Sequence, residues 1–261
     1  NATSVAVFDT AFHQTMPRKN YLYGLPYEYY TKYGARKYGA HGTSHRYVAA
    51  RTAEILNKPL EDLKIITLHL GAGASITAIK NGKSYDTSMG FTPLAGLMMA
   101  TRSGDVDPSL IYYIQEREGL SNAEMLRILN NKSGLLGVST LSSDMRDLEE
   151  VADTNEHAKL ALDMFLNRVV RYLGQYTFEM GGVDGIVFTA GIGENAANVR
   201  EDIIARLKFL GIEMDKEANN VRGVERIIST PESSATVLLV PTNEELEIAR
   251  DVERLKAQAG K

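Results

Sequence analysis

One stretch decides the fold of this 261-residue chain: Ile65-Ile66-Thr67-Leu68-His69-Leu70-Gly71-Ala72-Gly73-Ala74-Ser75-Ile76-Thr77. Apolar, β-prone residues stand on both sides of a run of small residues, which predicts two strands joined by a tight turn. Such a turn exposes backbone N–H groups that can hold a phosphate. His69, on the first strand, adds a donor for the same anion. The stretch therefore predicts a phosphate-binding hairpin or, equally simply, an ordinary turn.

The segments around this hairpin extend it into a mixed sheet. Lys80-Asn81-Gly82-Lys83 has the pattern of a hairpin turn, and residues 84–88 supply the third strand of an antiparallel meander. Later strands at 184–189 and 236–240 are separated by a helix, which is typical of parallel strands in an α/β fold. A further buried strand is expected at 4–8. Helices are expected at 42–56, 109–118, 121–131, 145–152, 156–180, 197–210 and 246–256, the first of them capped by Thr43 or Ser44.

Bulk composition excludes several classes of protein. The net charge is −4 and the pI is about 5.8, so the chain has no general electrostatic attraction to nucleic acid or to an anionic membrane. No apolar run reaches the roughly 20 residues that a membrane-spanning helix needs. Cysteine is absent, which excludes disulfides and thiolate sites. We therefore expect a cytoplasmic enzyme.

Two further strand ends carry residues suited to an anionic ligand. Gly191-Ile192-Gly193-Glu194-Asn195 follows a buried strand and precedes a helix, where a nucleotide can approach the backbone. A plain connecting turn explains the glycines equally well. Glu244, after the next strand, could hold Mg²⁺ or simply favour a helix N-terminus.

Four charged or polar residues outside these loops are also candidates. Arg102 lies in a turn of small residues, which suits a guanidinium aimed at a phosphoryl group, although a pair with Asp105 or Asp107 is the alternative. His41 and His45 lie four residues apart, but no further ligand completes a metal site. Asp9 could orient a nucleophile, hold Mg²⁺ or cap the following loop.

Together these segments resemble the acetate kinases, within the superfamily of sugar kinases, heat-shock-70 proteins and actin. The resemblance covers essentially the whole chain and is carried by residues 7–13, 41–45, 87–94, 132–134, 188–195 and 241–245. It implies an actin-like (ribonuclease H-like) domain, a homodimer, and Mg²⁺-dependent phosphoryl transfer between ATP and acetate that gives ADP and acetyl phosphate. No nucleic-acid or membrane partner is expected, on the grounds of charge and hydropathy given above.

The resemblance assigns roles residue by residue. Asp9, His41 and Arg102 match catalytic positions, and Glu244 matches a magnesium-associated carboxylate. The positions that match nucleotide contacts are His69, Gly71, Gly73, Asp144, Met145, Arg146, Gly191, Ile192 and Asn195. Phosphoryl transfer needs positioning and cationic stabilisation more than a covalent nucleophile, which suits this set.

The chain also departs from the family pattern. The family has Asn, Phe, Gly and Glu where this chain has Ala72, Ala40, Ala100 and Ala95, and a Cys where it has Leu68. These alanines indicate an engineered chain. Residues 1–36 are expected to be a remnant of a first domain, its last strand and connecting loop, and residues 37–261 a second, nucleotide-binding and dimerisation domain. We expect little or no turnover by this truncated chain alone.

Two other interpretations stay open. The chain could be a catalytically inert folding or dimerisation module with a vestigial pocket, which ADP binding with and without Mg²⁺ would distinguish. It could also be part of a propionate or butyrate kinase. The acyl pocket is mostly absent from these residues, so the sequence does not decide which acyl group is used.

Overall fold

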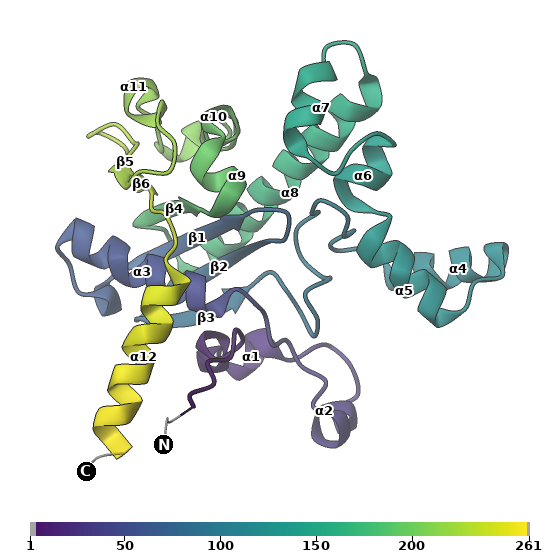
Figure 1. Ribbon diagram of the computed structural model, residues 1–261, viewed down its shortest axis with the longest axis horizontal. Helices are drawn as coiled ribbons and strands as arrows, with labels where there is room; N and C mark the ends of the chain where they lie inside the picture. Colours follow the sequence, from purple (N-terminus) through teal and green to yellow (C-terminus); the bar gives the residue numbers. More distant parts are fainter. Residues whose placement is uncertain (1–3, 260–261) are drawn as a thin grey trace.

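One six-stranded sheet organises the part of the chain that the computed structural model describes, residues 4–259 (Figure 1). Its strand order is β3-β2-β1-β4-β6-β5. The strands are β1 (Lys64–Leu70), β2 (Ala74–Lys80), β3 (Lys83–Thr87), β4 (Gly185–Thr189), β5 (Arg226–Ile227) and β6 (Thr236–Leu239). β1 to β3 form the antiparallel meander, whereas β1, β4 and β6 run parallel. The predicted mixed sheet is confirmed, with short β5 added antiparallel at one edge.

Strand β1 lies at the centre of this sheet because both of its faces are covered. Ile66 and Leu68 pack in the larger core, while Ile65 packs with Val187 in the smaller one. Alternating side chains of a strand point to opposite faces, so the nearly continuous apolar run of β1 fits burial on both sides. The hairpin turn after β2 has positive φ at Asn81 and Gly82, as the Asn-Gly pair predicts.

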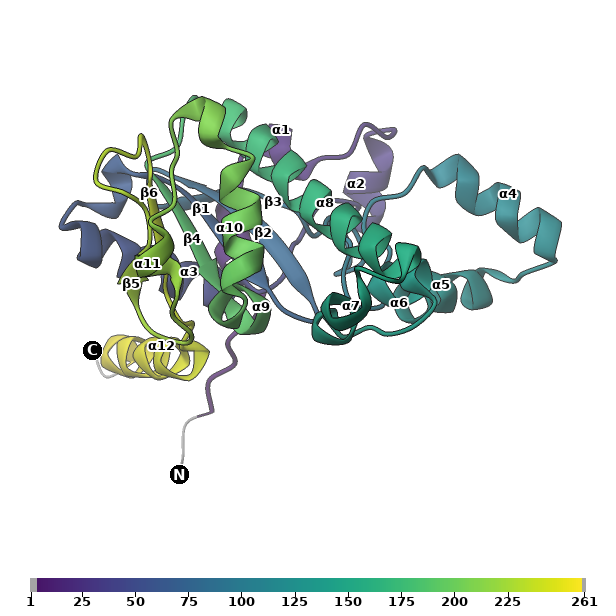
Figure 2. The same cartoon turned by 90° about the horizontal axis from the view of Figure 1, so that it is seen from above.

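Helices cover the two faces of the sheet. α3 (Gly42–Leu56) contributes to the smaller core, and the long α8 (Glu156–Met180) runs along the other face beside α10 (Ala197–Ala205) (Figure 2). α4 (Pro108–Glu118) and α5 (Asn122–Asn131) extend away from the sheet as an arm, at the right of Figure 1. α6 (Gly134–Ser139) and α7 (Met145–Val151) pack on α8. None of the helices among residues 4–259 is both long enough and apolar enough to cross a membrane.

The C-terminal helix α12 (Glu244–Ala259) is held against α3 by ion pairs. Nε of Arg46 lies 2.8 Å from Oε1 of Glu247, and Nη2 of Arg46 donates to Oδ2 of Asp251 over 2.5 Å. Asp251 is only 8% exposed, so this clamp lies at the contact between the two helices.

The predicted strand at 4–8 is wrong. Residues 4–8 form no strand, and Phe8 is 69% exposed. A strand needs a hydrogen-bonded neighbour, and none pairs with these residues within the described chain. The chain continues into a 3-10 helix (Phe12–Thr15), α1 (Arg18–Tyr21) and α2 (Glu28–Tyr33). Thr15 and Asn20 donate hydrogen bonds to carbonyl oxygens of β3, so this part of the expected first-domain remnant packs on the sheet.

Several smaller expectations also differ. The residue that precedes α3 is His41, in the left-handed region, and neither Thr43 nor Ser44 caps the helix. The expected turn at 190–195 is the short helix α9 (Ala190–Asn195), and the helix expected to reach residue 210 ends at Ala205. The sequence did not predict α6, β5 or α11 (Lys216–Asn219), which are all short. Residues 1–3 lie outside the described part of the chain.

Candidate functional site

The tip of the β1–β2 hairpin is a small loop held by backbone hydrogen bonds. The N–H of Gly71 donates to the carbonyl oxygen of Gly73 over 3.2 Å, and the N–H of Ala100 donates to that of Ala72 over 3.1 Å. The side chain of Ala72 is exposed. The tip is therefore fixed by the hydrogen bond between Gly71 and Gly73 and by the hydrogen bond from Ala100, in the segment that leads to Arg102.

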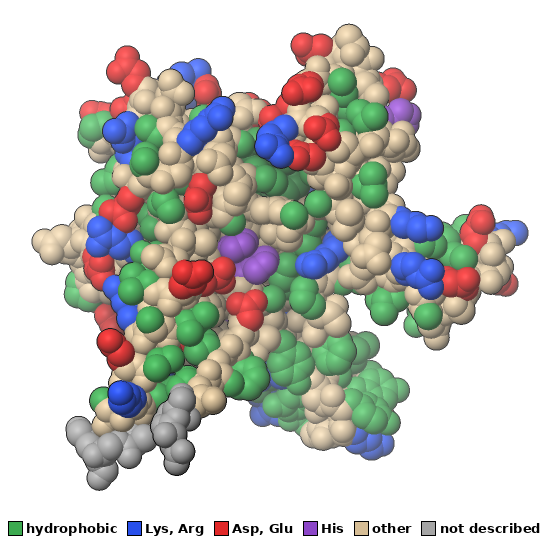
Figure 3. Space-filling view, viewed as in Figure 1, with side chains coloured by type: hydrophobic (Ala, Val, Ile, Leu, Met, Phe, Trp, Pro, Cys, Tyr) green, Lys and Arg blue, Asp and Glu red, His purple; other side chains and the backbone are tan. Residues whose placement is uncertain are grey.

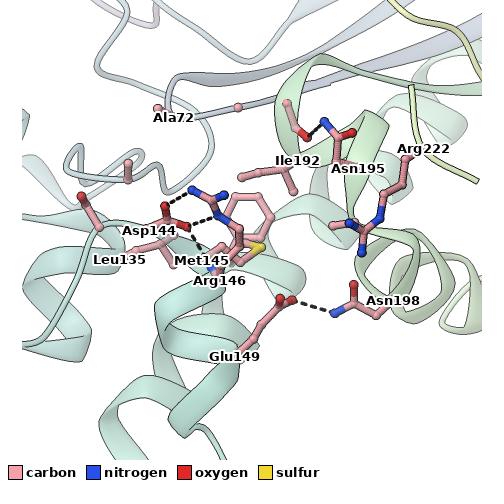
Figure 4. Close-up of a pocket in the computed structure, with 16 residues that line it drawn as sticks. Ala72, Leu135, Asp144, Met145, Arg146, Glu149, Ile192, Asn195, Asn198 and Arg222 are labelled. Carbon is pink, nitrogen blue, oxygen red and sulfur yellow. Dashed lines mark hydrogen bonds and ion pairs between the residues drawn. The ribbon is translucent and has the colours of Figure 1, made fainter. Parts of the chain in front are cut away.

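A cavity of about 640 Å³ opens beside this tip (Figure 4). It lies within the range of about 300–1,000 Å³ that is usual for small-molecule sites. Gly71 and Ala72 border it on one side, and Gly191, Ile192 and Asn195 on another. The two glycine-containing tips, 120 residues apart in the sequence, thus share one cavity.

Polar groups at the rim of the cavity are already paired with one another. Arg146 donates to both carboxylate oxygens of Asp144, over 3.1 and 2.6 Å, and this holds the pKa of Asp144 at about 2. Asp144 also caps α7 by accepting from the N–H of Arg146. Asn198 donates to Glu149 over 2.6 Å across the far end (Figure 4).

Several residues that line this cavity were not predicted from the sequence. Phe165 and Leu135 supply apolar wall, and Glu149, Asn198 and Arg222 supply polar groups. Asn198 lies on α10, which begins after the break at Ala196 that ends α9, so its spacing from Asn195 does not mark it as a site residue. Arg222 lies in an irregular segment, and no sequence pattern marks it.

A second group of polar residues surrounds Gly73. A β-carbon built on Gly73 would lie 3.6 Å from Nε2 of His41 and 3.6 Å from Nη1 of Arg102, so both of these side chains reach this glycine. Asp9 fixes the backbone there: its Oδ2 accepts from the N–H of His41 over 2.7 Å, and its carbonyl oxygen accepts from Gly42. Asp9 therefore caps α3 rather than the loop that comes directly after Asp9.

Arg102 forms no ion pair with either neighbouring aspartate in the described chain. Asp105 instead accepts from the N–H of Gly96 and from the hydroxyl of Tyr172, and Asp107 caps α4. The guanidinium donates to the carbonyl oxygen of Pro93 over 3.3 Å. Its charge is left without a carboxylate partner among these residues, as an anion-binding group requires.

His41 and His69 stack beside Gly73, with ring centroids 3.9 Å apart and planes 17° from parallel. Each Nδ1 lies 2.8 Å from a serine hydroxyl, that of Ser75 for His41 and that of Ser44 for His69. Burial lowers the pKa of His41, and it lowers the pKa of His69 to about 3. Both rings are therefore neutral at pH 7 and can offer N–H groups without an imidazolium charge. Figure 3 shows histidine atoms in the hollow at the centre of this face, with basic side chains on one side and acidic ones on the other.

Two carboxylates, those of Asp9 and Glu244, lie near one another in this region. Burial raises the pKa of Glu244, and the nearby charge of Asp9 raises it further. Within residues 4–259, no three His, Cys, Asp or Glu side chains gather into a metal site. Mg²⁺ usually takes one or two carboxylates together with water and phosphate oxygens, and two neighbouring carboxylates suit that kind of binding. His45 is not a candidate ligand, because both of its ring nitrogens have hydroxyl partners.

The predicted site residues thus fall into two adjoining groups. The cavity group comprises Gly71, Asp144, Met145, Arg146, Gly191, Ile192 and Asn195. The Gly73 group comprises Asp9, His41, His69, Gly73, Arg102 and Glu244. The hairpin tip belongs to both. Glu194, which was not predicted as a site residue, accepts from the N–H groups of Ala190 and Thr242 and so joins α9 to the segment before α12.

The sequence of this chain is similar to those of known acetate kinases. The model of the acetokinase family matches residues 1–250. The chain is 61% identical over 260 residues to an acetate kinase of Limosilactobacillus fermentum, covering 99% of this chain and 65% of that protein. It is 62% identical to one of Thermoanaerobacterium thermosaccharolyticum, covering 96% and 63%.

The fold of this chain also matches solved structures of acetate and propionate kinases. The crystal structure of Porphyromonas gingivalis acetate kinase superimposes with a TM-score of 0.91 at 53% identity, covering 94% of this chain and 62% of that one. A propionate kinase from Francisella tularensis gives 0.87 at 47% identity, covering 93% and 62%. The chain therefore spans somewhat less than two thirds of the length of these relatives.

Proposed function

The chain belongs to the acetokinase family, and on that premise we propose that it binds the nucleotide of a phosphoryl transfer between ATP and acetate. One observation carries the proposal: both glycine tips border one cavity, and the same hairpin tip leads through Gly73 to His41 and Arg102. The phosphates of ADP or ATP then follow the tip, and the adenosine lies in the cavity.

The charges around Gly73 suit the transferred phosphoryl group. Its developing negative charge lies between the ring N–H of His41 and the guanidinium of Arg102, which are fixed before the substrate arrives. Asp9 and Glu244 would hold Mg²⁺, which neutralises phosphate charge when it is bound. Acetate and acetyl phosphate are the proposed acyl partners.

A steric block of the cavity tests nucleotide binding. A β-carbon on Gly191 meets no atom within 4 Å, so Gly191→Leu should fill the cavity without disturbing the core. We expect it to abolish the calorimetric heat of ADP binding, with and without Mg²⁺, and to leave the melting temperature unchanged. The matched control is Gly174→Leu on α8, another helical glycine with open space around it. Equal ADP affinity in both variants would refute the proposal and favour an inert module.

The proposal includes low turnover by these 261 residues alone. Ala72 offers no side-chain donor at the tip, and losing one transition-state donor can cost about a hundredfold in rate. Hydroxamate trapping of acetyl phosphate measures this, and turnover near that of the full-length relatives would contradict it. Whether the alanines reflect engineering stays a prediction.

A propionate kinase is a second candidate, since one solved relative carries that name. Competition between acetate and propionate in the same trapping assay distinguishes the two.

The assignment of residues 37–261 as a nucleotide-binding and dimerisation domain, with residues 1–36 from a first domain, also stays a proposal. Sedimentation equilibrium tests the homodimer, because a monomer has a mass of 28.8 kDa.

A further inference from the structure

Four side chains form a continuous hydrogen-bonded line behind the Gly73 group. Nδ1 of His41 lies 2.8 Å from Oγ of Ser75, and the same oxygen lies 2.7 Å from Nε2 of His45. Nδ1 of His45 lies 2.6 Å from Oγ1 of Thr67. Ser75, His45 and Thr67 are fully buried, so bulk water does not replace a lost partner.

Protons in such a line can be arranged in two directions. A neutral imidazole donates at one nitrogen and accepts at the other. If Thr67 donates to His45, then His45 donates to Ser75, Ser75 donates to Nδ1 of His41, and His41 holds its proton on Nε2. In the reverse direction, His41 donates from Nδ1 and leaves Nε2 as a bare acceptor. Burial lowers the pKa of both histidines, which keeps the rings neutral at pH 7.

The Thr67 end of the line selects between these directions. Within residues 4–259 the buried hydroxyl of Thr67 bonds only Nδ1 of His45, so its proton is satisfied only when Thr67 donates to His45. Nε2 of His41 is the ring nitrogen beside Gly73 and Nη1 of Arg102. An anion bound there is attracted by an N–H group and repelled by a lone pair. We infer that Thr67, His45 and Ser75 are positioning residues that hold His41 in the tautomer with its proton on Nε2, an inference that rests on the proposed phosphoryl-binding function.

His69 repeats the arrangement in a shorter form. Its Nδ1 lies 2.8 Å from the hydroxyl of Ser44, and its ring stacks on that of His41. Ser44 comes from α3 and bonds a histidine of β1, while Ser75 comes from β2 and bonds the histidine that precedes α3. Both stacked rings therefore have Nδ1 satisfied from behind, which leaves Nε2 of each for a ligand.

Nitrogen NMR of the imidazole rings in the full chain tests the inference without requiring activity. Long-range proton–nitrogen spectra at pH 7.5 report which ring nitrogen carries the proton, and the chain has only five histidines to assign. We expect the Nε2–H tautomer of His41 in about tenfold excess, as one net hydrogen bond implies. A wild-type spectrum with the proton on Nδ1 would overturn the inference.

Substitution of Thr67 identifies the origin of the preference. Thr67→Val keeps the shape and removes the hydroxyl, so both tautomers of His41 should be populated within about threefold. Thr67→Ser keeps the hydroxyl and should retain the wild-type tautomer. Thr77→Val is the matched control, because Thr77 is the partner of Thr67 on β2 and its hydroxyl pairs with Thr87 instead.

Each result bears on one proposal only. An unchanged His41 tautomer in folded Thr67→Val overturns the positioning role, whatever the affinity for ADP. The expected tautomers combined with no calorimetric ADP binding overturn the proposed function and leave the proton arrangement standing.

Discussion

At the scale of single residues, Ala72 is the position in the hairpin tip where a larger side chain can be introduced. Its side chain is exposed at the cavity, and its backbone lies outside the left-handed region. Asn in place of alanine would add an amide donor without backbone strain. A hydrogen bond to a charged group contributes about 1.5–3 kcal/mol.

We expect Ala72→Asn to tighten ADP binding by about tenfold or more, measured by calorimetry. Ala72→Asp is the control, since it has the same shape but a carboxylate in place of the donor, and it should weaken binding. Equal affinities for the two variants would show that the tip does not contact phosphate.

The buried histidines give a second residue-scale prediction, for stability against pH. Burial lowers the pKa of His13 to about 4 and that of His69 to about 3, and His41 and His45 shift the same way. Below a pH of about 6.5 the unfolded chain therefore binds protons that the folded chain does not. Each histidine then removes roughly 1.4 kcal/mol of stability per pH unit as the pH falls toward its folded pKa. Asp86, whose pKa burial raises to about 6, offsets part of this loss.

Urea unfolding at pH 7.5, 6.0 and 5.0 should show this decline. His157→Gln is the control, because His157 lies on the exposed side of α8 and should not alter the slope. A midpoint that stays constant between pH 7.5 and 5.0 would contradict the prediction.

At the scale of elements, the clamp between α3 and α12 links the helix after His41 to the helix that begins at Glu244. Arg46→Met removes the shared cation and leaves Glu247 and Asp251 with weaker partners in Arg250 and Arg254. We expect a loss of about 1–3 kcal/mol in local stability, seen as faster hydrogen exchange in α12.

Arg250→Met provides the comparison for this clamp. Arg250 is half-exposed and lies 3.5 Å from Glu247, and such a pair contributes little. Similar exchange rates in the two variants would mean that Arg46 does not hold α12 in place.

The elements that could be predicted from the sequence are those with a strong local pattern. The Asn81-Gly82 turn and the helices expected at 109–118 and 156–180 are confirmed, the first of these helices beginning one residue earlier, at Pro108. Short α6, α11 and β5 have no periodicity to detect, and their pairing depends on distant segments. The strand at 4–8 failed for the opposite reason, because β-prone residues without a neighbouring strand do not form a sheet.

At the scale of the whole molecule, the site could be predicted only in part. Glycines at strand ends are visible in a sequence, and the family resemblance added the charged residues. Glu149, Asn198 and Arg222 reach the cavity only because α7, α10 and the segment before β5 converge on it. The hydroxyls of Ser44 and Ser75 likewise meet histidines that lie 25 and 34 residues away along the chain. Such pairings depend on tertiary structure and leave no local signal.

The cavity is assembled from stretches that lie between residues 71 and 222, and no one of them forms it alone. A molecule that occupies it must therefore favour the folded chain over the unfolded ensemble by mass action. ADP at about a hundred times its dissociation constant would add about 2.7 kcal/mol to the free energy of unfolding. A cell's supply of such a ligand would then act as a folding aid for this polypeptide, and its depletion would leave a larger unfolded fraction exposed to proteases.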